Sequence, residues 1–330
     1  MTDPSSGDPN GSPASAPDGG SPTDGGPPAD GGSPTDGGPP ADGGSPTEAS
    51  VSTDATAPTD RAAPADDGPP IGGDSLPRTV GSAVGVGVLG VLAYVAVSLV
   101  FAQVGQLVGG FSLGVSLALS LVVGQYVAFV GTGLAYLRLR GFDRARIVAY
   151  LGIERPSLLG LVIAVVGAVA TFAVALTLSA VVASSGVEPA QNQGAAVAMQ
   201  NPAIIPAIVL AMFLVVGPCE EFLFRGVVQS RLRESLPAAP AIVVASAVFA
   251  PAHVISLSGG GASGVAIAIG LLVFPSLLFG AVYEYTGNLV VVALMHALYN
   301  SILLSLLYIV IAYGPELERA AAAGAALLPV

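Results

Sequence analysis

The chain contains a series of long apolar segments, and each is close to or above the length needed to cross a lipid bilayer. About 20 apolar residues span the hydrocarbon core as a helix. Hydrophobic residues make up 52% of the chain and charged residues 10%, which is typical of polytopic membrane proteins. The sequence therefore predicts an all-α transmembrane bundle of about seven spans (six to eight), expected at residues 81–106, 112–137, 157–183, 203–230, 240–258, 265–284 and 288–313.

Residues 1–78 differ from this pattern because they are mainly Pro, Gly, Ser, Asp and Thr. A twelve-residue unit beginning at Ser21 recurs from Ser33 and starts again at Ser45. It offers no apolar face to bury, and such compositions stay extended and disordered. We interpret it as a solubilising tether, with a docking arm as the alternative. The predicted organisation is an acidic disordered arm (1–78), N-terminal transmembrane helices (79–199), a helical core (200–313) and a C-terminal tail (314–330).

The net charge of −11 belongs to the arm. Residues 1–80 hold 13 of the 22 acidic residues and only two arginines, which gives 2 − 13 = −11. The remainder has nine acids and nine arginines, so its balance is zero. An acidic arm argues against nucleic acid as a partner. The single cysteine, Cys219, excludes an intrachain disulfide and a cysteine-based zinc site.

Arginine placement predicts the orientation of the spans. Five arginines lie in the connection between the second and third spans, and Arg231 and Arg233 follow the fourth. The connections at 184–202 and 259–264 contain no Lys or Arg. The positive-inside rule places the arginine-bearing connections in the cytoplasm. We therefore expect a multi-pass plasma-membrane protein with a cytoplasmic arm and, if the spans number seven, a C-terminus outside.

Three charged residues lie inside the fourth apolar segment. Charges in a membrane span are costly and are functional candidates by default. Glu221 and Arg225 are four residues apart, so they share a helix face and can pair. Glu220 points about 100° away from Glu221 and is left to address another group. A structural ion pair alone would explain Glu221 and Arg225 but not Glu220, which fits a general base.

The only two histidines of the chain, His253 and His296, also fall within apolar segments. At a helical rise of 1.5 Å per residue, Glu220 lies ~16 Å, His253 ~20 Å and His296 ~12 Å from the expected cytoplasmic ends of their spans, taken as Arg231, residue 240 and residue 288. They are thus expected to meet in the cytoplasmic half of the bilayer. Helical spacing places Phe249 beside His253 and Asn300 beside His296.

A carboxylate, two imidazoles and an amide around one cavity are suited to activating water. Glu220 would take the proton, and the Asn300 amide would stabilise an oxyanion or complete a ligand set. His253 and His296, with Glu220 or Asn300, are also candidate ligands for a divalent metal such as Zn²⁺. No His-Glu-x-x-His helix is present, so the metal remains one of two alternatives.

The motifs Glu-Glu-x-x-x-Arg (from Glu220), Phe-x-x-x-His (from Phe249) and His-x-x-x-Asn (from His296) follow in order on successive apolar helices. This pattern resembles the CPBP intramembrane proteases, a family that includes type II CAAX prenyl endopeptidases and abortive-infection and bacteriocin-processing proteins. The resemblance covers about residues 200–313. It implies that Glu220 activates water, that His253 and His296 position the water or a metal, and that Asn300 helps form the oxyanion site. Glu221 and Arg225 would be the supporting pair.

The resemblance predicts an endopeptidase acting on membrane-bound peptide or protein substrates, with CAAX-type C-terminal processing as one form. It leaves the substrate and the need for a lipid group open, since family members differ in both. Two other functions are compatible with intramembrane acids and histidines. One is a non-catalytic membrane scaffold or immunity partner, and the other is a proton-coupled transporter. The oligomeric state is not encoded in any pattern found.

Overall fold

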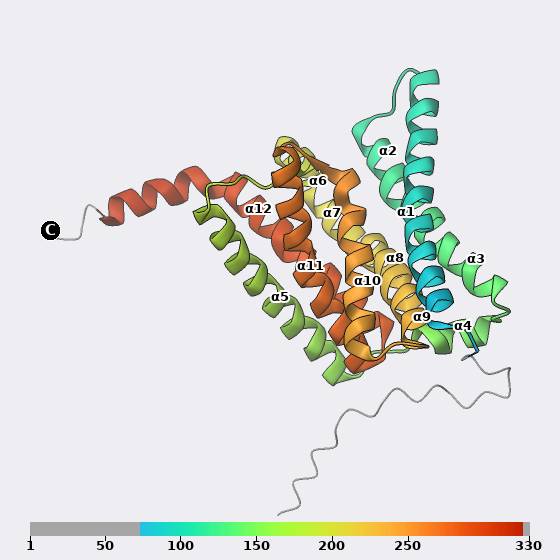
Figure 1. The fold of residues 1–330 in the computed structure, drawn as a ribbon. Coiled ribbons are helices and arrows are strands. Elements are labelled where there is room, and N and C mark those ends of the chain that lie inside the picture. Colours follow the sequence, from blue (N-terminus) through green and yellow to red (C-terminus); the bar gives the residue numbers. More distant parts are fainter. Residues whose placement is uncertain (1–72, 326–330) are drawn as a thin grey trace, which may run out of the picture. The chain divides into compact units, whose positions relative to one another are not determined.

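The computed structural model describes residues 73–325, so the predicted arm lies almost wholly outside the described residues. The described part is helical except for one pair of two-residue strands. It contains seven helices long and apolar enough to cross a membrane, which confirms the predicted fold class (Figure 1). They are Leu76–Leu107, Leu113–Leu139, Leu158–Ser184, Pro202–Arg233, Ala238–Ser256, Gly261–Thr286 and Leu289–Glu316.

Three of the spans are single α-helices, namely α1 (Leu76–Leu107), α5 (Leu158–Ser184) and α11 (Gly261–Thr286). The seventh span is the first part of α12 (Leu289–Ala325). The second span is built from α2 (Leu113–Ala118), η1 (Leu119–Gly124), η2 (Tyr126–Val130) and α3 (Gly131–Leu139). The fifth span consists of α10 (Ala238–Ala252) and η6 (His253–Ser256).

The fourth span has the most breaks in its helical geometry. It runs through η3 (Pro202–Ile204), α7 (Ile205–Ala211), η4 (Met212–Val216), α8 (Gly217–Glu221), η5 (Phe222–Gln229) and α9 (Ser230–Arg233). The segments η1, η2, η4 and η5 are π-helical, and η3 and η6 are 3₁₀-helical. Outside the spans lie the short helices α4 (Arg144–Leu151) and α6 (Gln193–Gln200) and the strands β1 (Gln191–Asn192) and β2 (Leu257–Ser258).

Capping residues fix several helix ends. Asp143 accepts a hydrogen bond from the backbone N–H of Arg146 and so starts α4, and Ser157 caps α5 in the same way. Gly287 ends α11 with a positive φ of 61°, a conformation that favours glycine. Helix α12 continues to Ala325 through Pro315, so the predicted boundary at residue 313 is not a helix end.

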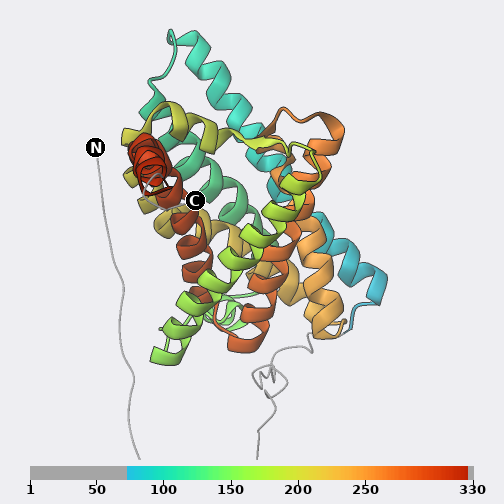
Figure 2. The same cartoon turned by 90° about the vertical axis from the view of Figure 1, so that its left-hand side faces the viewer.

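The fourth span is the centre of the bundle. Every residue from Cys219 to Leu232 is buried, as expected for a helix surrounded by others. Its segment η5 packs against α1 and α10, and α8 packs against α12, which in turn lies beside α5 (Figure 2). Glycines in the first two spans allow each of them to approach the fourth span closely. A Cβ atom added to Gly90 would lie 2.5 Å from Leu223, and one added to Gly133 would lie 2.6 Å from Phe222.

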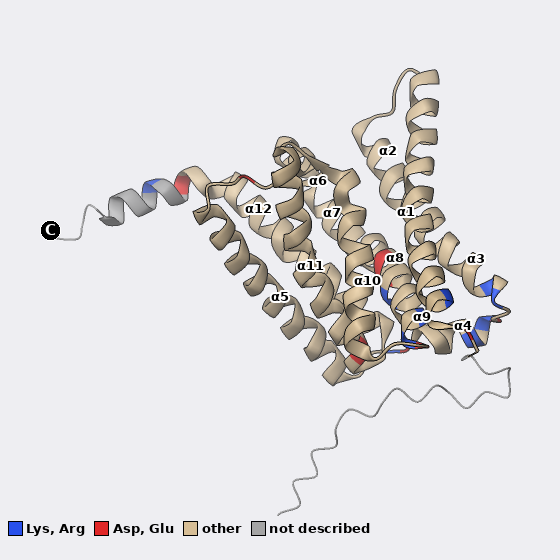
Figure 3. Cartoon of the chain, viewed as in Figure 1, with Lys and Arg blue, Asp and Glu red and all other residues tan. Residues whose placement is uncertain are grey.

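The arginines outside the fourth span gather mainly at one end of the bundle (Figure 3). There Glu234 accepts two hydrogen bonds of 2.8 Å from Arg140 and one of 2.7 Å from Tyr150. Burial disfavours the charge of Arg140, but the hydrogen bonds to Glu234 and the attraction to its carboxylate together outweigh burial and raise the pKa of Arg140. Burial and the Glu234 carboxylate raise the pKa of Tyr150 well above its usual value. Arg231 joins this network by binding Glu234 and Asp74.

Because Arg140 follows the second span and Glu234 follows the fourth, the two arginine-bearing connections meet at the same end, as the arginine pattern predicts. The arginine-free connections meet too: β1 pairs antiparallel with β2, and the backbone N–H of Ala190 donates to the carbonyl of Gly264 (3.0 Å).

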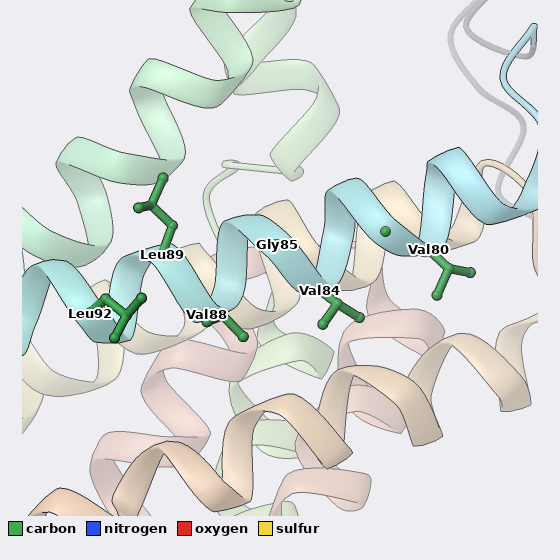
Figure 4. A pocket seen from close by; sticks show the side chains of 7 residues that line it. Val80, Val84, Gly85, Val88, Leu89 and Leu92 are labelled. Carbon is green, nitrogen blue, oxygen red and sulfur yellow. The ribbon is translucent and has the colours of Figure 1, made fainter.

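A shallow apolar groove runs along α1 (Figure 4) and is lined by Val80, Gly81, Val84, Gly85, Val88, Leu89 and Leu92.

Candidate active site

Three spans bring one carboxylate and two imidazoles together. Oε2 of Glu220, from the fourth span, lies 3.9 Å from Nε2 of His253 at the end of the fifth. The same oxygen lies 3.9 Å from Nε2 of His296 in the seventh. It is buried and has no hydrogen-bond partner in the described part of the chain. The separation is too long for direct hydrogen bonds and is of the size at which polar groups share a water molecule.

The second nitrogen of each imidazole is held by a hydrogen-bond acceptor. Nδ1 of His253 donates to the backbone carbonyl of Phe249 (3.2 Å), and Nδ1 of His296 donates to Oε1 of Glu221 (2.8 Å). With the proton on Nδ1, a neutral imidazole presents a lone pair at Nε2. Both Nε2 atoms therefore face Glu220 as acceptors.

Glu221 and Arg225 form the ion pair that their spacing predicts. Oε2 of Glu221 lies 3.1 Å from Nε of Arg225, and both side chains are fully buried. Arg225 also donates to Oγ of Ser276 in α11 (3.1 Å). Because Glu221 holds Arg225 with one oxygen and His296 with the other, the pair fixes the orientation of His296. The link from Glu221 to His296 is absent from the sequence-based interpretation.

Aromatic rings pack against both imidazoles. The ring of Phe249 lies 4.7 Å from that of His253, as the spacing of the two residues predicts. Phe279, from α11, stacks on His296 at 4.8 Å. The Arg225 guanidinium lies 5.0 Å from the centre of the Phe249 ring, an arrangement that favours a buried cation. The side chain of His296 is 5% exposed and that of His253 is 23% exposed, so His296 is nearly fully covered and His253 only in part.

Local backbone features place the three groups. Gly217, three residues before Glu220, packs directly on α12, since an added Cβ would lie 2.8 Å from the carbonyl oxygen of Ala293. This contact draws α8 towards His296. In the fifth span Pro251 is followed by a change from α-helix to a 3₁₀ turn that starts at His253. His253 therefore lies at the C-terminal end of α10, where the α-helix changes to the 3₁₀ turn.

Asn300 lies one helical turn after His296. Its amide nitrogen donates to Sδ of Met212 at 3.6 Å, and none of its hydrogen bonds in the structure reaches Glu220 or the histidines. The role of Asn300 at an oxyanion thus stays a prediction.

Gln125 of the second span is a contact that the sequence-based interpretation missed. Its amide Nε2 donates to Oε1 of Glu220 at 3.2 Å, and the residue is only 5% exposed. A polar residue inside an apolar span was a usable signal. The sequence does not indicate that Glu220 is its partner, because the two residues are 95 positions apart.

The predicted metal site requires more ligands than the two facing histidines. Within residues 73–325, no group of three or more His, Cys, Asp and Glu side chains is arranged so that it could hold a metal ion. The facing nitrogens of His253 and His296 have the chemistry of zinc ligands, but their present spacing does not make a complete ligand set. Zn²⁺ therefore stays a prediction.

The fold and the site define a polytopic helical membrane protein with a buried acid–histidine cluster. Residues 202–302 match the family model described as Type II CAAX prenyl endopeptidase Rce1-like. The chain therefore carries a domain of this CPBP-type family, which confirms the resemblance predicted from the three motifs. The matched segment contains every residue of those motifs. No curated protein and no solved structure matches the chain.

Proposed function

We propose that the protein is an intramembrane endopeptidase in which Glu220 activates the attacking water. The observation that carries the proposal is the convergence of three acceptor atoms, Oε2 of Glu220 and Nε2 of His253 and His296, at 3.9 Å from the carboxylate oxygen to each nitrogen. A water molecule has two O–H donors, so it can donate to Oε2 of Glu220 and to one of the two imidazole nitrogens at a time. Membership of the Rce1-like family supports a protease.

In the proposed reaction the water oxygen attacks the carbonyl carbon of the scissile peptide bond. One proton of the water passes to Oε2 of Glu220, while an imidazole nitrogen accepts a hydrogen bond from its other O–H and keeps the water in line. The same proton then passes from Glu220 to the leaving nitrogen as the C–N bond breaks. The products are a carboxylic acid and an amine, and Glu220 returns to its ionised form. The new carboxylic acid carries the second proton of the water and releases it to the amine or to solvent.

Asn300 is the proposed oxyanion donor. Its amide nitrogen is engaged with the Met212 sulfur at 3.6 Å, and a thioether is a weak acceptor. A developing oxyanion is a far stronger acceptor, so the amide exchanges a weak bond for a charge-assisted one only when charge appears. This difference between ground state and transition state is what lowers the barrier.

The proposed substrates are membrane-bound peptides. The description of the matched family, a prenyl endopeptidase, supports a C-terminal segment that carries a prenylated cysteine. An assay with two peptides of one sequence, prenylated and unmodified, decides this point. Faster cleavage of the unmodified peptide would contradict the prenyl preference and leave the endopeptidase proposal in place.

The test uses the full chain reconstituted in liposomes. Glu220→Gln and His253→Ala are expected to abolish cleavage, whereas Glu284→Gln is the matched control. Glu284 pairs with Arg233 at 2.8 Å, away from the candidate site, so its amide variant keeps activity. Retention of cleavage in both site variants would defeat the proposal. Uptake driven by a pH gradient, with no cleavage, would favour a transporter.

We further propose that the arginine-rich end of the bundle is cytoplasmic, since both arginine-bearing connections lie there. A Cys219→Ser background allows single cysteines to be placed at Arg144 and at Ser185, which flank opposite ends of the spans. Only the cysteine at position 185 should react with a membrane-impermeant reagent in intact cells. The opposite labelling pattern would reverse the orientation.

A further inference from the structure

We infer that Gln125 is a positioning residue for Glu220, so that the reactive site extends into the second span. This inference rests on the proposed function, because it concerns how the proposed base is held. It adds a residue that lies outside the family-matching segment 202–302. It also gives the N-terminal spans a part in the chemistry in addition to packing.

The geometry of the Glu220 carboxylate is the first argument. Its Oε1 accepts the hydrogen bond from Gln125 (3.2 Å), while Oε2 faces the two imidazoles. The terminal torsion of a glutamate is intrinsically broad, so an unrestrained carboxylate samples many orientations. A donor fixed on one oxygen selects the orientation in which the other oxygen points at His253 and His296. Gln125 thereby defines which oxygen is the base.

The burial of Gln125 is the second argument. An amide inside an apolar span is costly unless it makes hydrogen bonds. Gln229, which is fully buried, illustrates the structural solution, since its Nε2 donates to the backbone carbonyl of Gly280 at 3.0 Å. Gln125 instead donates to a carboxylate of the candidate site. The Oε1 atoms of both glutamines have no hydrogen-bond partner among the described residues, so the acceptor that each donor reaches is what distinguishes them. The placement of Gln125 is explained by Glu220.

The local backbone supplies the third argument. Gln125 stands between the π-helical segments η1 and η2, and Glu220 stands in α8 between η4 and η5. π-Helical turns are rare and frequently accompany functional sites. Gly124, next to Gln125, lets the span approach α1, because an added Cβ would lie 3.1 Å from the Tyr94 ring. Gln125 and Glu220 thus both lie next to π-helical segments of their spans.

The kinetic test compares Gln125→Met with the control Gln229→Met in the reconstituted full chain. Methionine keeps the length of glutamine and removes the donor. For Gln125→Met, kcat should fall roughly tenfold to a hundredfold with KM unchanged, since the carboxylate is misaligned but the substrate is still bound. Gln125→Glu should lose at least as much, because it places a second acid beside Glu220 and supplies no N–H in its ionised form. Gln229→Met should keep the wild-type kcat.

A second measurement does not depend on activity. The melting temperature is measured for Gln125→Met, Glu220→Met and the double variant. If Gln125 holds Glu220, removing it costs more when the carboxylate is present, so the shifts are not additive. Additive shifts overturn the inference, whether or not the wild type cleaves peptides. Wild-type kcat in Gln125→Met overturns it as well, whereas an inactive wild type with non-additive shifts counts against the endopeptidase and supports the contact.

Discussion

Replacement of Arg225 tests how the buried charges of the site are balanced. Glu221 and Arg225 are both fully buried and lie 3.1 Å apart. Arg225→Met keeps the approximate side-chain volume and leaves the Glu221 carboxylate without its cation. Removal of one partner of a buried pair costs about 3–5 kcal/mol. Loss of the contact with Phe249, whose ring centre lies 5.0 Å from the guanidinium carbon, adds about 0.5–2 kcal/mol.

The matched variant is Glu221→Gln combined with Arg225→Met. The amide of the double variant still accepts the hydrogen bond from Nδ1 of His296, and no uncompensated charge remains from the pair. It should recover most of the stability that Arg225→Met loses. The measurement is the free energy of unfolding in mixed micelles. Equal losses in the single and double variants would refute the reasoning, because the unpaired carboxylate would then not be the source of the penalty.

Three further predictions concern packing, the arginine-rich end and metal content. Gly90→Val should destabilise the bundle by about 1–3 kcal/mol, measured by unfolding, because its Cβ would lie 2.5 Å from Leu223. The hydrogen bond from Arg231 lowers the pKa of Asp74 below 3.8, so the stabilisation is present above that pH and is lost as the pH falls through the lowered value. Asp74→Asn should therefore melt earlier than wild type near pH 7, and the difference should shrink below pH 3.8. If Zn²⁺ is bound, elemental analysis of purified protein gives one equivalent and chelation lowers activity. Full activity in metal-free protein would exclude a catalytic role for the metal.

The spans and the ion pair were predictable because they follow local rules. An apolar run of about 20 residues has few alternatives to a membrane helix. A spacing of four residues places Glu221 and Arg225 on one helix face whatever the rest of the fold does. The end of α12 was not predictable in this way, since Pro315 is tolerated within the helix instead of ending it.

The sequence predicts that Glu220, His253 and His296 lie at similar depths in the bilayer, but it does not predict that their helices are neighbours. Counting residues from the expected cytoplasmic end of each span gives the height of each group, but it does not say which helices are neighbours. Rotation about each helix axis is set by side-chain packing, such as the contact of Gly217 with the backbone of α12. For the same reason the bond between Glu221 and His296, 75 positions apart, could not be predicted from spacing.

Of the two hydrogen bonds that spacing could not predict, the one from Gln125 extends the site beyond its family-matching segment, because Glu221 and His296 both lie within residues 202–302. Glu221 orients His296 from one side, and Gln125 orients Glu220 from the other. The facing atoms of the base and of the imidazole are thus each set by a partner on a different span. The glycines that face η5 from the first two spans allow this approach, because larger side chains at Gly90 or Gly133 would push those spans away. Close packing of the N-terminal spans is therefore a condition for a correctly aimed base, and a steric change at either glycine should reduce the alignment of Glu220 along with stability.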